Sequence, residues 1–327
     1  MPLSLLAACP AYGPTPLRRL AGRAGPAAMA KDETGRMGLG SFKALGGVYA
    51  VFRILADGAG LPAHAETATA PAFRRHAAET TFVCASAGNH GLSVAAGAAL
   101  FGAAARVHLA ATVPESFAAR LRAKGAAVVR SGETYEESVA AAIADEAETG
   151  AVHLADGSWP GYVERPALVM EGYSVMAEEL RVAFAASGVW PTHVFLQAGV
   201  GGMAAAVADA VRRRWAVQPE IVVVEPRAAA CLTASAAAGR PVRAEGPVSC
   251  MGRLDCKEPS ILAVDLLRQA GVRYAQVDDA AAEAACAALE ALDVRTTPSG
   301  AAGYAGLLAR DLPGAARALV VVSEGRA

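Results

Sequence analysis

The sequence predicts an α/β fold in which mostly parallel sheets are covered by helices on both faces. Short apolar runs, typical of buried strands, alternate along the chain with longer alanine-rich runs of helical pattern. In addition, glycine-rich turns follow several of the apolar runs. Ligands of such sheets bind at the carboxyl ends of the strands, so we expect the chemistry to lie in these turns.

The expected strands are apolar runs that are each too short for a helix and rich in valine or other β-forming residues. In order they are TFVCA (81–85), RVHL (106–109), AVVR (127–130), VHL (152–154), HVFLQ (193–197), IVVVE (221–225), RYAQV (273–277) and ALVVVS (318–323). The expected helices are the longer alanine-rich segments before, between and after them. They span 43–56, 91–101, 114–124, 134–148, 166–184, 203–215, 260–269, 280–291 and 301–308.

Composition narrows the class of protein. Of the 327 residues, 54% are hydrophobic and 19% charged, which is enough for a large core and too apolar for disorder. The net charge of −1 and 6% aromatic residues give no basic or stacking surface, so no nucleic-acid partner is expected. No apolar run is long enough to span a membrane, and no basic segment precedes the apolar N-terminus, so we expect a cytoplasmic protein. The six cysteines form no CxxC pair, and no metal site is predicted.

The first unusual segment is a glycine-rich turn that leads into a predicted helix at Lys43. The chain has only four lysines, so each merits attention. The N-terminus of a helix disfavours a positive charge, and burial disfavours it further. A neutral lysine amine is a nucleophile suited to a Schiff base. The alternative interpretation is an ordinary surface lysine at a helix start.

The second segment is Ser86-Ala87-Gly88-Asn89-His90-Gly91, which lies between a predicted strand and a predicted helix. Small residues there allow backbone N–H groups to point at a carboxylate or a phosphate. The Asn89 amide can hold a phenolic or carbonyl oxygen. The alternative is a plain strand–helix turn with Ser86 as its N-cap.

The third segment is the turn Gly199-Val200-Gly201-Gly202-Met203, which opens another predicted helix and is typical of a phosphate site. It fits a dinucleotide fold with Glu225 as the ribose-binding acid, and hence an NAD-dependent oxidoreductase. It also fits a monophosphate cofactor such as pyridoxal 5'-phosphate. Spacing does not decide between them, but only the second interpretation gives all three segments a role, so we favour it.

With these residues in view, the chain resembles the fold-type II pyridoxal phosphate enzymes, the group of threonine dehydratase and the tryptophan synthase β subunit. Three stretches are more specific and resemble diaminopropionate ammonia-lyase. They are GLGSFKALGG (38–47), DGSWPGY (156–162) and MGRLDCKEPS (251–260). The resemblance runs from about Thr15 to Ser323 and implies two lobes, with 1–75 and 155–327 as the large cofactor-binding domain and 76–154 as a small mobile domain.

The resemblance also implies roles for particular residues. Lys43 would carry the cofactor as a Schiff base, Asn89 would hold its 3′ oxygen, and the turn 199–203 would bind its phosphate. Ser323 would face the pyridine nitrogen. A hydroxyl there leaves the ring a weaker electron sink than a carboxylate would, which favours rapid β-elimination. Asp156 matches a carboxylate that takes the Cα proton.

The substrate side of the resemblance includes one departure. The segment comprising Ser86, Ala87, Gly88 and His90 would bind the substrate, with its carboxylate at the helix start. The family has a second acid at the position of Ala87, where it is thought to allow both enantiomers to be used. Alanine cannot accept a proton, so we expect a preference for one isomer, the L form. The departure also leaves the substrate itself open, because that acid is a candidate for recognising the β-amino group.

The resulting expectation is a homodimeric ammonia-lyase that converts 2,3-diaminopropionate to pyruvate and ammonia by α,β-elimination. The alternatives are an L-serine or L-threonine dehydratase, a β-replacement synthase on the same fold, or the oxidoreductase described above. Cys231 and Cys256 lie on segments that flank the expected site. Free thiols are expected there in a reducing cytosol, with a disulfide as the alternative.

Overall fold

The computed structural model describes residues 2–20 and 27–326. Internal contacts divide the chain into two units. Unit 1 comprises Met1–Tyr12, Lys43–Asp156 and Glu164–Gly172, and unit 2 comprises Gly13–Phe42, Gly157–Val163 and Tyr173–Ala327. This division differs from the expected boundary at residue 75, because the helix that begins at Lys43 packs against the helix that begins at Asn89.

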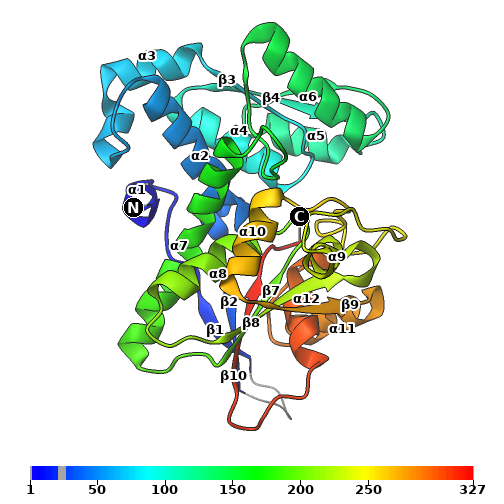
Figure 1. The fold of residues 1–327 in the computed structure, drawn as a ribbon. Helices are drawn as coiled ribbons and strands as arrows, with labels where there is room; N and C mark the ends of the chain where they lie inside the picture. Colours follow the sequence, from blue (N-terminus) through cyan, green and yellow to red (C-terminus); the bar gives the residue numbers. More distant parts are fainter. Residues whose placement is uncertain (1, 21–26, 327) are drawn as a thin grey trace. The chain divides into compact units, whose positions relative to one another are not determined.

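Unit 1 is built on a four-stranded parallel sheet with the strand order β5-β4-β3-β6. Its strands are β3 (Thr81–Cys84), β4 (Ala104–Leu109), β5 (Ala127–Arg130) and β6 (Val152–His153). Its helices are α1 (Pro2–Leu6), α2 (Lys43–Gly58), α3 (Pro71–Glu79), α4 (Asn89–Phe101), α5 (Glu115–Arg122) and α6 (Tyr135–Thr149), with a 3-10 turn η2 (Ala65–Thr69) (Figure 1).

Small residues bring helices α2 and α4 into close contact. A Cβ at Gly47 would lie 2.0 Å from Oγ of Ser93, and a Cβ at Gly97 would lie 3.1 Å from Cα of Val48. Glycine at these two positions lets the backbones approach where any side chain would separate them. The position of Lys43 at the start of α2 therefore depends on this packing.

Unit 2 is built on a six-stranded sheet with the order β1-β2-β10-β7-β8-β9, in which only the β1–β2 pair is antiparallel. Its strands are β1 (Leu17–Leu20), β2 (Ala27–Asp32), β7 (His193–Gln197), β8 (Glu220–Pro226), β9 (Arg273–Val277) and β10 (Arg317–Val322). Its helices are α8 (Gly202–Arg214), α9 (Cys231–Ala238), α10 (Ile261–Ala270), α11 (Asp279–Glu290) and α12 (Pro298–Leu308), with 3-10 turns η1 (Arg36–Gly38) and η3 (Arg227–Ala229). Helix α7 (Glu164–Ser187) begins in unit 1 and continues into unit 2.

Valines dominate the core of the unit 2 sheet. Val222, Val224, Val320 and Val322 on the central strands are fully buried and pack with Phe195 of β7. Helices α11 and α12 add alanine and leucine side chains to the same cluster. Fully buried parallel strands read as continuous apolar runs, which is why they were recognisable in the sequence.

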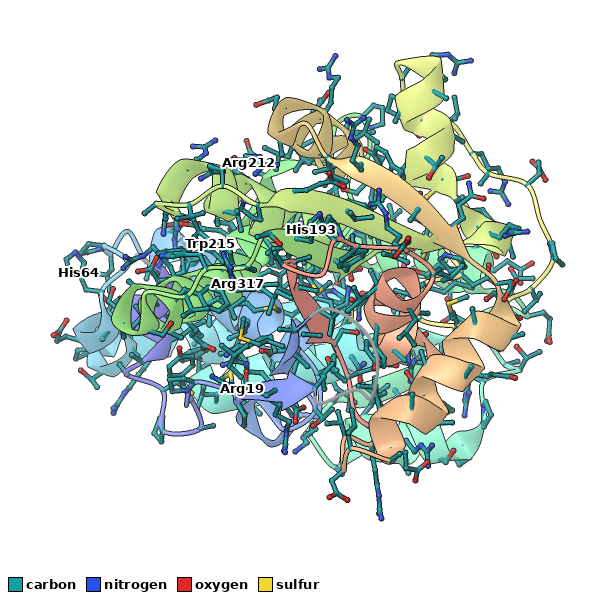
Figure 2. All side chains as sticks on the ribbon, turned by 90° about the horizontal axis from the view of Figure 1, so that it is seen from below. Arg19, His64, His193, Arg212, Trp215 and Arg317 are labelled. Carbon is teal, nitrogen blue, oxygen red and sulfur yellow. The ribbon has the colours of Figure 1, made fainter. Side chains whose placement is uncertain are left out.

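The amino ends of the unit 2 strands are bound into neighbouring loops. Arg317 at the start of β10 donates from Nε to the carbonyl of Trp190 at 2.7 Å, and Arg212 of α8 donates from Nε to the carbonyl of Ala270 at 2.8 Å. The indole of Trp215 donates to the carbonyl of Ala177 at 3.0 Å. Figure 2 labels Arg317, Arg212 and Trp215 at this part of unit 2. Arg317 therefore holds the loop before β7, and Arg212 holds the end of helix α10.

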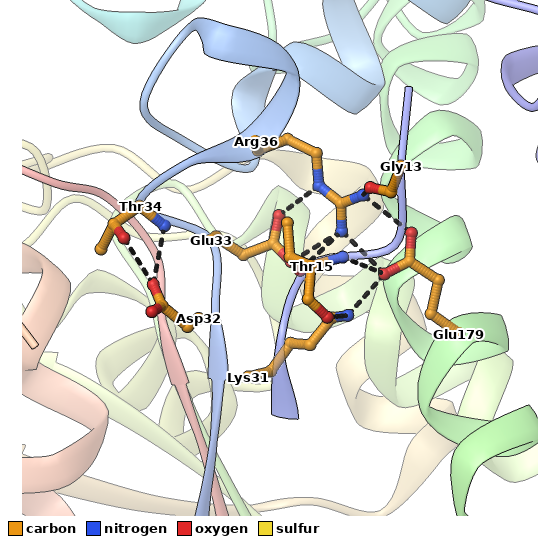
Figure 3. A network of polar contacts seen from close by, with 8 residues as sticks. All are labelled: Gly13, Thr15, Lys31, Asp32, Glu33, Thr34, Arg36 and Glu179. Atoms are coloured by element: carbon orange, nitrogen blue, oxygen red, sulfur yellow. Dashed lines mark hydrogen bonds and ion pairs between the residues drawn. The ribbon is translucent and has the colours of Figure 1, made fainter. Parts of the chain in front are cut away.

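A buried network of charges lies in unit 2 (Figure 3). The guanidinium of Arg36, which is fully buried, binds the carboxylates of Glu33 at 2.7 and 2.8 Å and of Glu179 at 2.7 and 2.9 Å. Lys31 adds a contact to Glu179 at 2.5 Å, and the hydroxyl of Thr15 donates to Glu33 at 2.6 Å. Burial alone would lower the pKa of Arg36, but its two carboxylate partners outweigh that effect and raise it. The network holds three parts of unit 2 together: the segment at Gly13 and Thr15, the end of β2, and helix α7.

The predicted fold class is confirmed, and every predicted strand and helix is present with ends that shift by up to three residues. Five further elements were not predicted from the sequence: β1, β2, α1, α3 and α9. Strands β1 and β2 are charged or alanine-rich and lack the apolar signal of the inner strands. Among the described residues, no helix combines the length and the apolar character that crossing a membrane requires.

Candidate functional site

The unit 1 part of the site lies at the carboxyl ends of two neighbouring strands. Strands β3 and β6 are parallel, with Phe82 opposite Val152 and Val83 opposite His153. The Ser86–Gly91 segment follows β3, and Asp156 follows β6. Because parallel neighbours end at the same edge of a sheet, the topology brings the two segments together.

The side chain of Lys43 meets that of Asp156. Nζ of Lys43 donates to Oδ2 of Asp156, and the two side chains are 22% and 25% exposed. Burial opposes the charged form of Asp156, but the adjacent ammonium outweighs it and holds the pKa of this carboxyl well below its usual range. Two residues that are 113 positions apart in the sequence thus form a proton-donor and proton-acceptor pair.

The Ser86–Gly91 segment forms a tight turn that opens helix α4 at Asn89. Gly88 is the N-cap residue, and its backbone N–H donates to Oγ of Ser86 at 3.3 Å. A Cβ at Gly91 would lie 2.1 Å from the carbonyl oxygen of Ser86, so the turn closes only with glycine there. Ser86, Ala87, Gly88 and Asn89 are partly exposed. The segment therefore presents the start of a helix to a ligand, as an anion site requires.

His90 lies behind this turn. The imidazole is 5% exposed, and its Nε2 is 2.8 Å from the carbonyl oxygen of Leu154. Burial lowers its pKa, so the ring is neutral near pH 7 and Nε2 carries the hydrogen that the carbonyl accepts. The contact ties the first turn of α4 to the strand end that carries Asp156. A direct substrate contact by His90 stays a prediction, whereas its structural contact is to the backbone of residue 154.

The unit 2 part of the site is the glycine turn between β7 and α8. Gly201 is the N-cap of α8 with φ of 101°, a conformation that favours glycine. A Cβ at Gly201 would lie 2.8 Å from Cβ of Ala263, and a Cβ at Gly199 would lie 3.0 Å from Sγ of Cys256. The turn 199–203 therefore requires glycine at two positions, and it leaves the first N–H groups of α8 available to an anion.

Ser323 follows the neighbouring strand β10 and is 4% exposed. Its carbonyl accepts a hydrogen bond from the backbone N–H of Phe42 at 3.1 Å, and the N–H of Gly325 donates to the carbonyl of Gly40 at 2.9 Å. The segment that ends immediately before Lys43 is thus paired with the segment that carries Ser323. Strands β10 and β7 are parallel neighbours, so Ser323 and the glycine turn follow adjacent strand ends.

Glu225, the candidate ribose-binding acid, has a different role. Its side chain is fully buried, and its carboxylate accepts from the N–H groups of Leu232 and Thr233 at 2.8 Å each and from the Thr233 hydroxyl at 2.6 Å. Burial raises its pKa against the effect of these donors. The carboxylate caps the start of α9, so it is not placed to bind a ribose. The interpretation of this region as a dinucleotide site therefore lacks the acidic residue that it requires.

The stretches DGSWPGY and MGRLDCKEPS each contain a serine for which the sequence predicted no role. Oγ of Ser158 lies 2.7 Å from Oγ of Ser260, and the N–H of Ser260 donates to the carbonyl of Val200 at 2.9 Å. These serines fasten both stretches to the glycine turn. Lys257 in the same region donates to the carbonyls of Ala228 and Pro247 at 2.7 and 2.9 Å, so it is a structural lysine.

Neither Cys231 nor Cys256 is part of a disulfide bond. Sγ of Cys231 is 3.7 Å from the carbonyl oxygen of Gly199. Burial raises the pKa of the Cys231 thiol, so it is protonated at neutral pH. Both cysteines pack around the glycine turn.

A family model described as pyridoxal-phosphate dependent enzyme matches residues 8–324. The diaminopropionate ammonia-lyase of Salmonella typhimurium is 34% identical over 88% of this chain and 73% of its own length. A probable D-serine dehydratase of Paracidovorax citrulli is 30% identical over 82% of this chain and 62% of its own length. The structure of Escherichia coli diaminopropionate ammonia-lyase with an aminoacrylate–PLP azomethine reaction intermediate matches with a TM-score of 0.85 at 26% identity, covering 99% of this chain and 87% of that chain.

Proposed function

The chain belongs to the family of pyridoxal-phosphate dependent enzymes, and from that premise we propose that it removes ammonia from L-2,3-diaminopropionate by α,β-elimination. The cofactor is pyridoxal 5'-phosphate, and the fold is that of the fold-type II enzymes. The overall reaction consumes one water and gives one pyruvate and two ammonia molecules. The proposed substrate rests on the relatives named above and on the chemistry of the residues below.

The residues present fit the cofactor. The glycine turn 199–203 offers helix N–H groups to its phosphate, and glycine at positions 199 and 201 lets the turn pack closely against the residues behind it. Lys43 supplies the amine for the aldehyde, Asn89 the amide for the 3′ oxygen, and Ser323 a hydroxyl for the ring nitrogen. Bound pyridoxal phosphate supplies the electron sink for the electrons released from Cα.

The contact between Lys43 and Asp156 is the observation that carries the proposal. Elimination breaks the Cα–H bond and the Cβ–N bond, so one group must accept the Cα proton and an acid must keep the departing amine protonated. The neighbouring Lys43 lowers the pKa of Asp156 and keeps this carboxyl ionised, which is the form that a proton acceptor needs. The lysine lies within reach of the carboxylate and can pass the proton on. The start of α4 at Ser86–Gly91 would hold the substrate carboxylate and fix Cα beside this pair.

The preference for the L isomer follows from the side chain at position 87. Proton abstraction needs a base on the face of Cα that carries the hydrogen, and that face differs between the enantiomers. Asp156 is a base for one face, whereas the methyl group of Ala87 offers none for the other. We therefore expect Ala87→Asp to introduce use of the D isomer.

The decisive assay measures 2-oxo acid release from a panel of L- and D-2,3-diaminopropionate, L- and D-serine, and L-threonine. We expect L-diaminopropionate to be turned over fastest. Faster turnover of L-serine or L-threonine would make the chain a dehydratase instead. D-serine is included because one relative is a probable D-serine dehydratase. Formation of a new amino acid with an added nucleophile would indicate β-replacement.

Two variants test the roles proposed for Asp156 and Lys43. Asp156→Asn should slow turnover by about 100-fold to 10,000-fold with the cofactor still bound, because it removes the base and leaves the fold. Asp57→Asn is the matched control, because this acid on α2 is 58% exposed and should leave turnover unchanged. Lys43→Ala should abolish the visible absorbance of the lysine-bound cofactor. Normal turnover in Asp156→Asn, or a retained band in Lys43→Ala, would contradict the assignments.

We further propose a cytoplasmic homodimer in which the region 76–154 closes over the substrate, following the family resemblance. Sedimentation at several protein concentrations tests the dimer. Protection of this region from hydrogen exchange on addition of a non-reactive substrate analogue tests the closure.

A further inference from the structure

Unit 1 contains an apolar cavity that the proposed reaction does not use. Its volume is about 540 Å³, within the range of small-molecule sites. It lies among α1 and the turn after it, α2, η2, α3 and the end of α4. Its walls are mostly aliphatic and aromatic, and include Leu5, Leu6, Val48, Phe52, Ala68 and Phe101.

Rings stiffen one wall of this cavity. The ring centroids of Phe52 and Phe101 are 5.4 Å apart, and each of these rings also packs against Phe73, at 5.4 and 5.9 Å. Leu100, another lining residue, is 46% exposed. The apolar surface is therefore preformed by packed rings and continues to the solvent, so a ligand can enter without unfolding the wall.

One charge lies on this apolar lining. Arg74 of α3 is the cation among the lining residues, and it is exposed. Within the described parts of the chain its guanidinium has no ion pair and no hydrogen bond, and no carboxylate lines the cavity. An apolar cavity with a single unpaired guanidinium is complementary to a molecule with an apolar tail and one acidic head.

We propose that this cavity binds a medium-chain monocarboxylic acid, with the alkyl tail among the phenylalanines and the carboxylate on Arg74. The inference goes beyond the proposed reaction and does not depend on its substrate, because the lining includes none of the residues assigned to that reaction. Val48 and Phe52 belong to α2, the helix that begins at Lys43, so a bound acid would contact the helix that carries this lysine.

The test measures binding of butanoate, hexanoate, octanoate and decanoate to the holoenzyme by calorimetry, with 1-decanol as the uncharged analogue. We expect one molecule of decanoate per chain. Affinity should rise about threefold to fourfold for each added methylene, because each one buries further apolar surface. Decanol should bind at least about tenfold more weakly than decanoate, because a charge-assisted hydrogen bond is lost.

Variants locate the site. Arg74→Gln should weaken decanoate binding about tenfold, whereas Arg75→Gln, the adjacent exposed arginine outside the lining, should leave it unchanged. Ala68→Phe should abolish binding by filling the cavity, with 2-oxo acid release confirming that each variant is folded. Absence of saturable binding, equal affinity in Arg74→Gln and wild type, or undiminished binding in Ala68→Phe would overturn the proposal. So would dissociation of an oligomer by Ala68→Phe, because a second copy would then be the occupant.

Discussion

Replacing Arg36 with methionine removes the central cation of the buried network in unit 2 and keeps a side chain of similar length. Six hydrogen bonds to Glu33, Glu179, Thr15 and the carbonyl of Gly13 are lost. Glu179 keeps Lys31 at 2.5 Å, but Glu33 keeps only the Thr15 hydroxyl among the contacts described above. Breaking one side of a buried ion pair costs about 3–5 kcal/mol of the free energy of unfolding, because the remaining charge is left uncompensated.

Urea unfolding of the holoenzyme, followed by circular dichroism at saturating cofactor, measures this cost. The matched control is Arg268→Gln, which breaks an ion pair with Asp265 whose side chains are 68% and 59% exposed. Such a pair contributes about 0–1 kcal/mol. The double variant Arg36→Met/Glu33→Gln should recover about half of the loss, because it removes the uncompensated charge. A shift for Arg36→Met no larger than that for Arg268→Gln, or no recovery in the double variant, would refute the reasoning.

The same network predicts that the effect of Arg36→Met on the free energy of unfolding depends on pH. Burial opposes the ionised form of Glu179, but Arg36 and Lys31 outweigh it and lower the pKa of this carboxyl. The resulting stabilisation is present above the pKa of an unfolded glutamate, about 4.3, and is lost as the pH falls through the folded value. The difference in unfolding free energy between wild type and Arg36→Met should therefore be largest at neutral pH and shrink below about pH 4.

Two further predictions concern His153 and Gly201. Burial lowers the pKa of His153 to about 4, so proton uptake favours unfolding, and wild type should lose about 2 kcal/mol between pH 7 and pH 5. Urea titrations at the two pH values measure this loss, and it should be absent in His153→Gln. His64→Gln is the control, because His64 is exposed and its replacement should leave the loss in place. An unchanged pH dependence in His153→Gln would contradict the prediction. Gly201→Ala should weaken cofactor binding at least about tenfold in an absorbance titration, because residue 201 has φ of 101° and the added Cβ would lie 2.8 Å from another Cβ. Gly252→Ala is the control, because a Cβ there meets nothing within 4 Å, and equal affinities in the two variants would count against the turn as the phosphate site.

The sequence determined the inner part of the fold because fully buried parallel strands have a local signature. The strands β7, β8 and β10 each have an apolar interior, with polar or charged residues only at their ends, and their boundaries could be placed to within a residue or two. The glycine turns could also be predicted from the sequence, because close approach at Gly91 and positive φ at Gly201 require glycine at these positions. Both features depend on a few consecutive residues, so a local sequence pattern is enough to reveal them.

Only the tertiary structure decided which distant side chains meet. The contacts of Lys43 with Asp156 and of Arg36 with Glu179 join residues that are 113 and 143 positions apart, and their approach depends on how helices pack on sheets. No periodicity or spacing encodes such contacts, because each depends on the volumes of side chains elsewhere, as at Gly47 on α2. The sequence by itself therefore determined the inner strands, most of the helices and the chemical groups that this protein has available, and packing decided which of those groups act together.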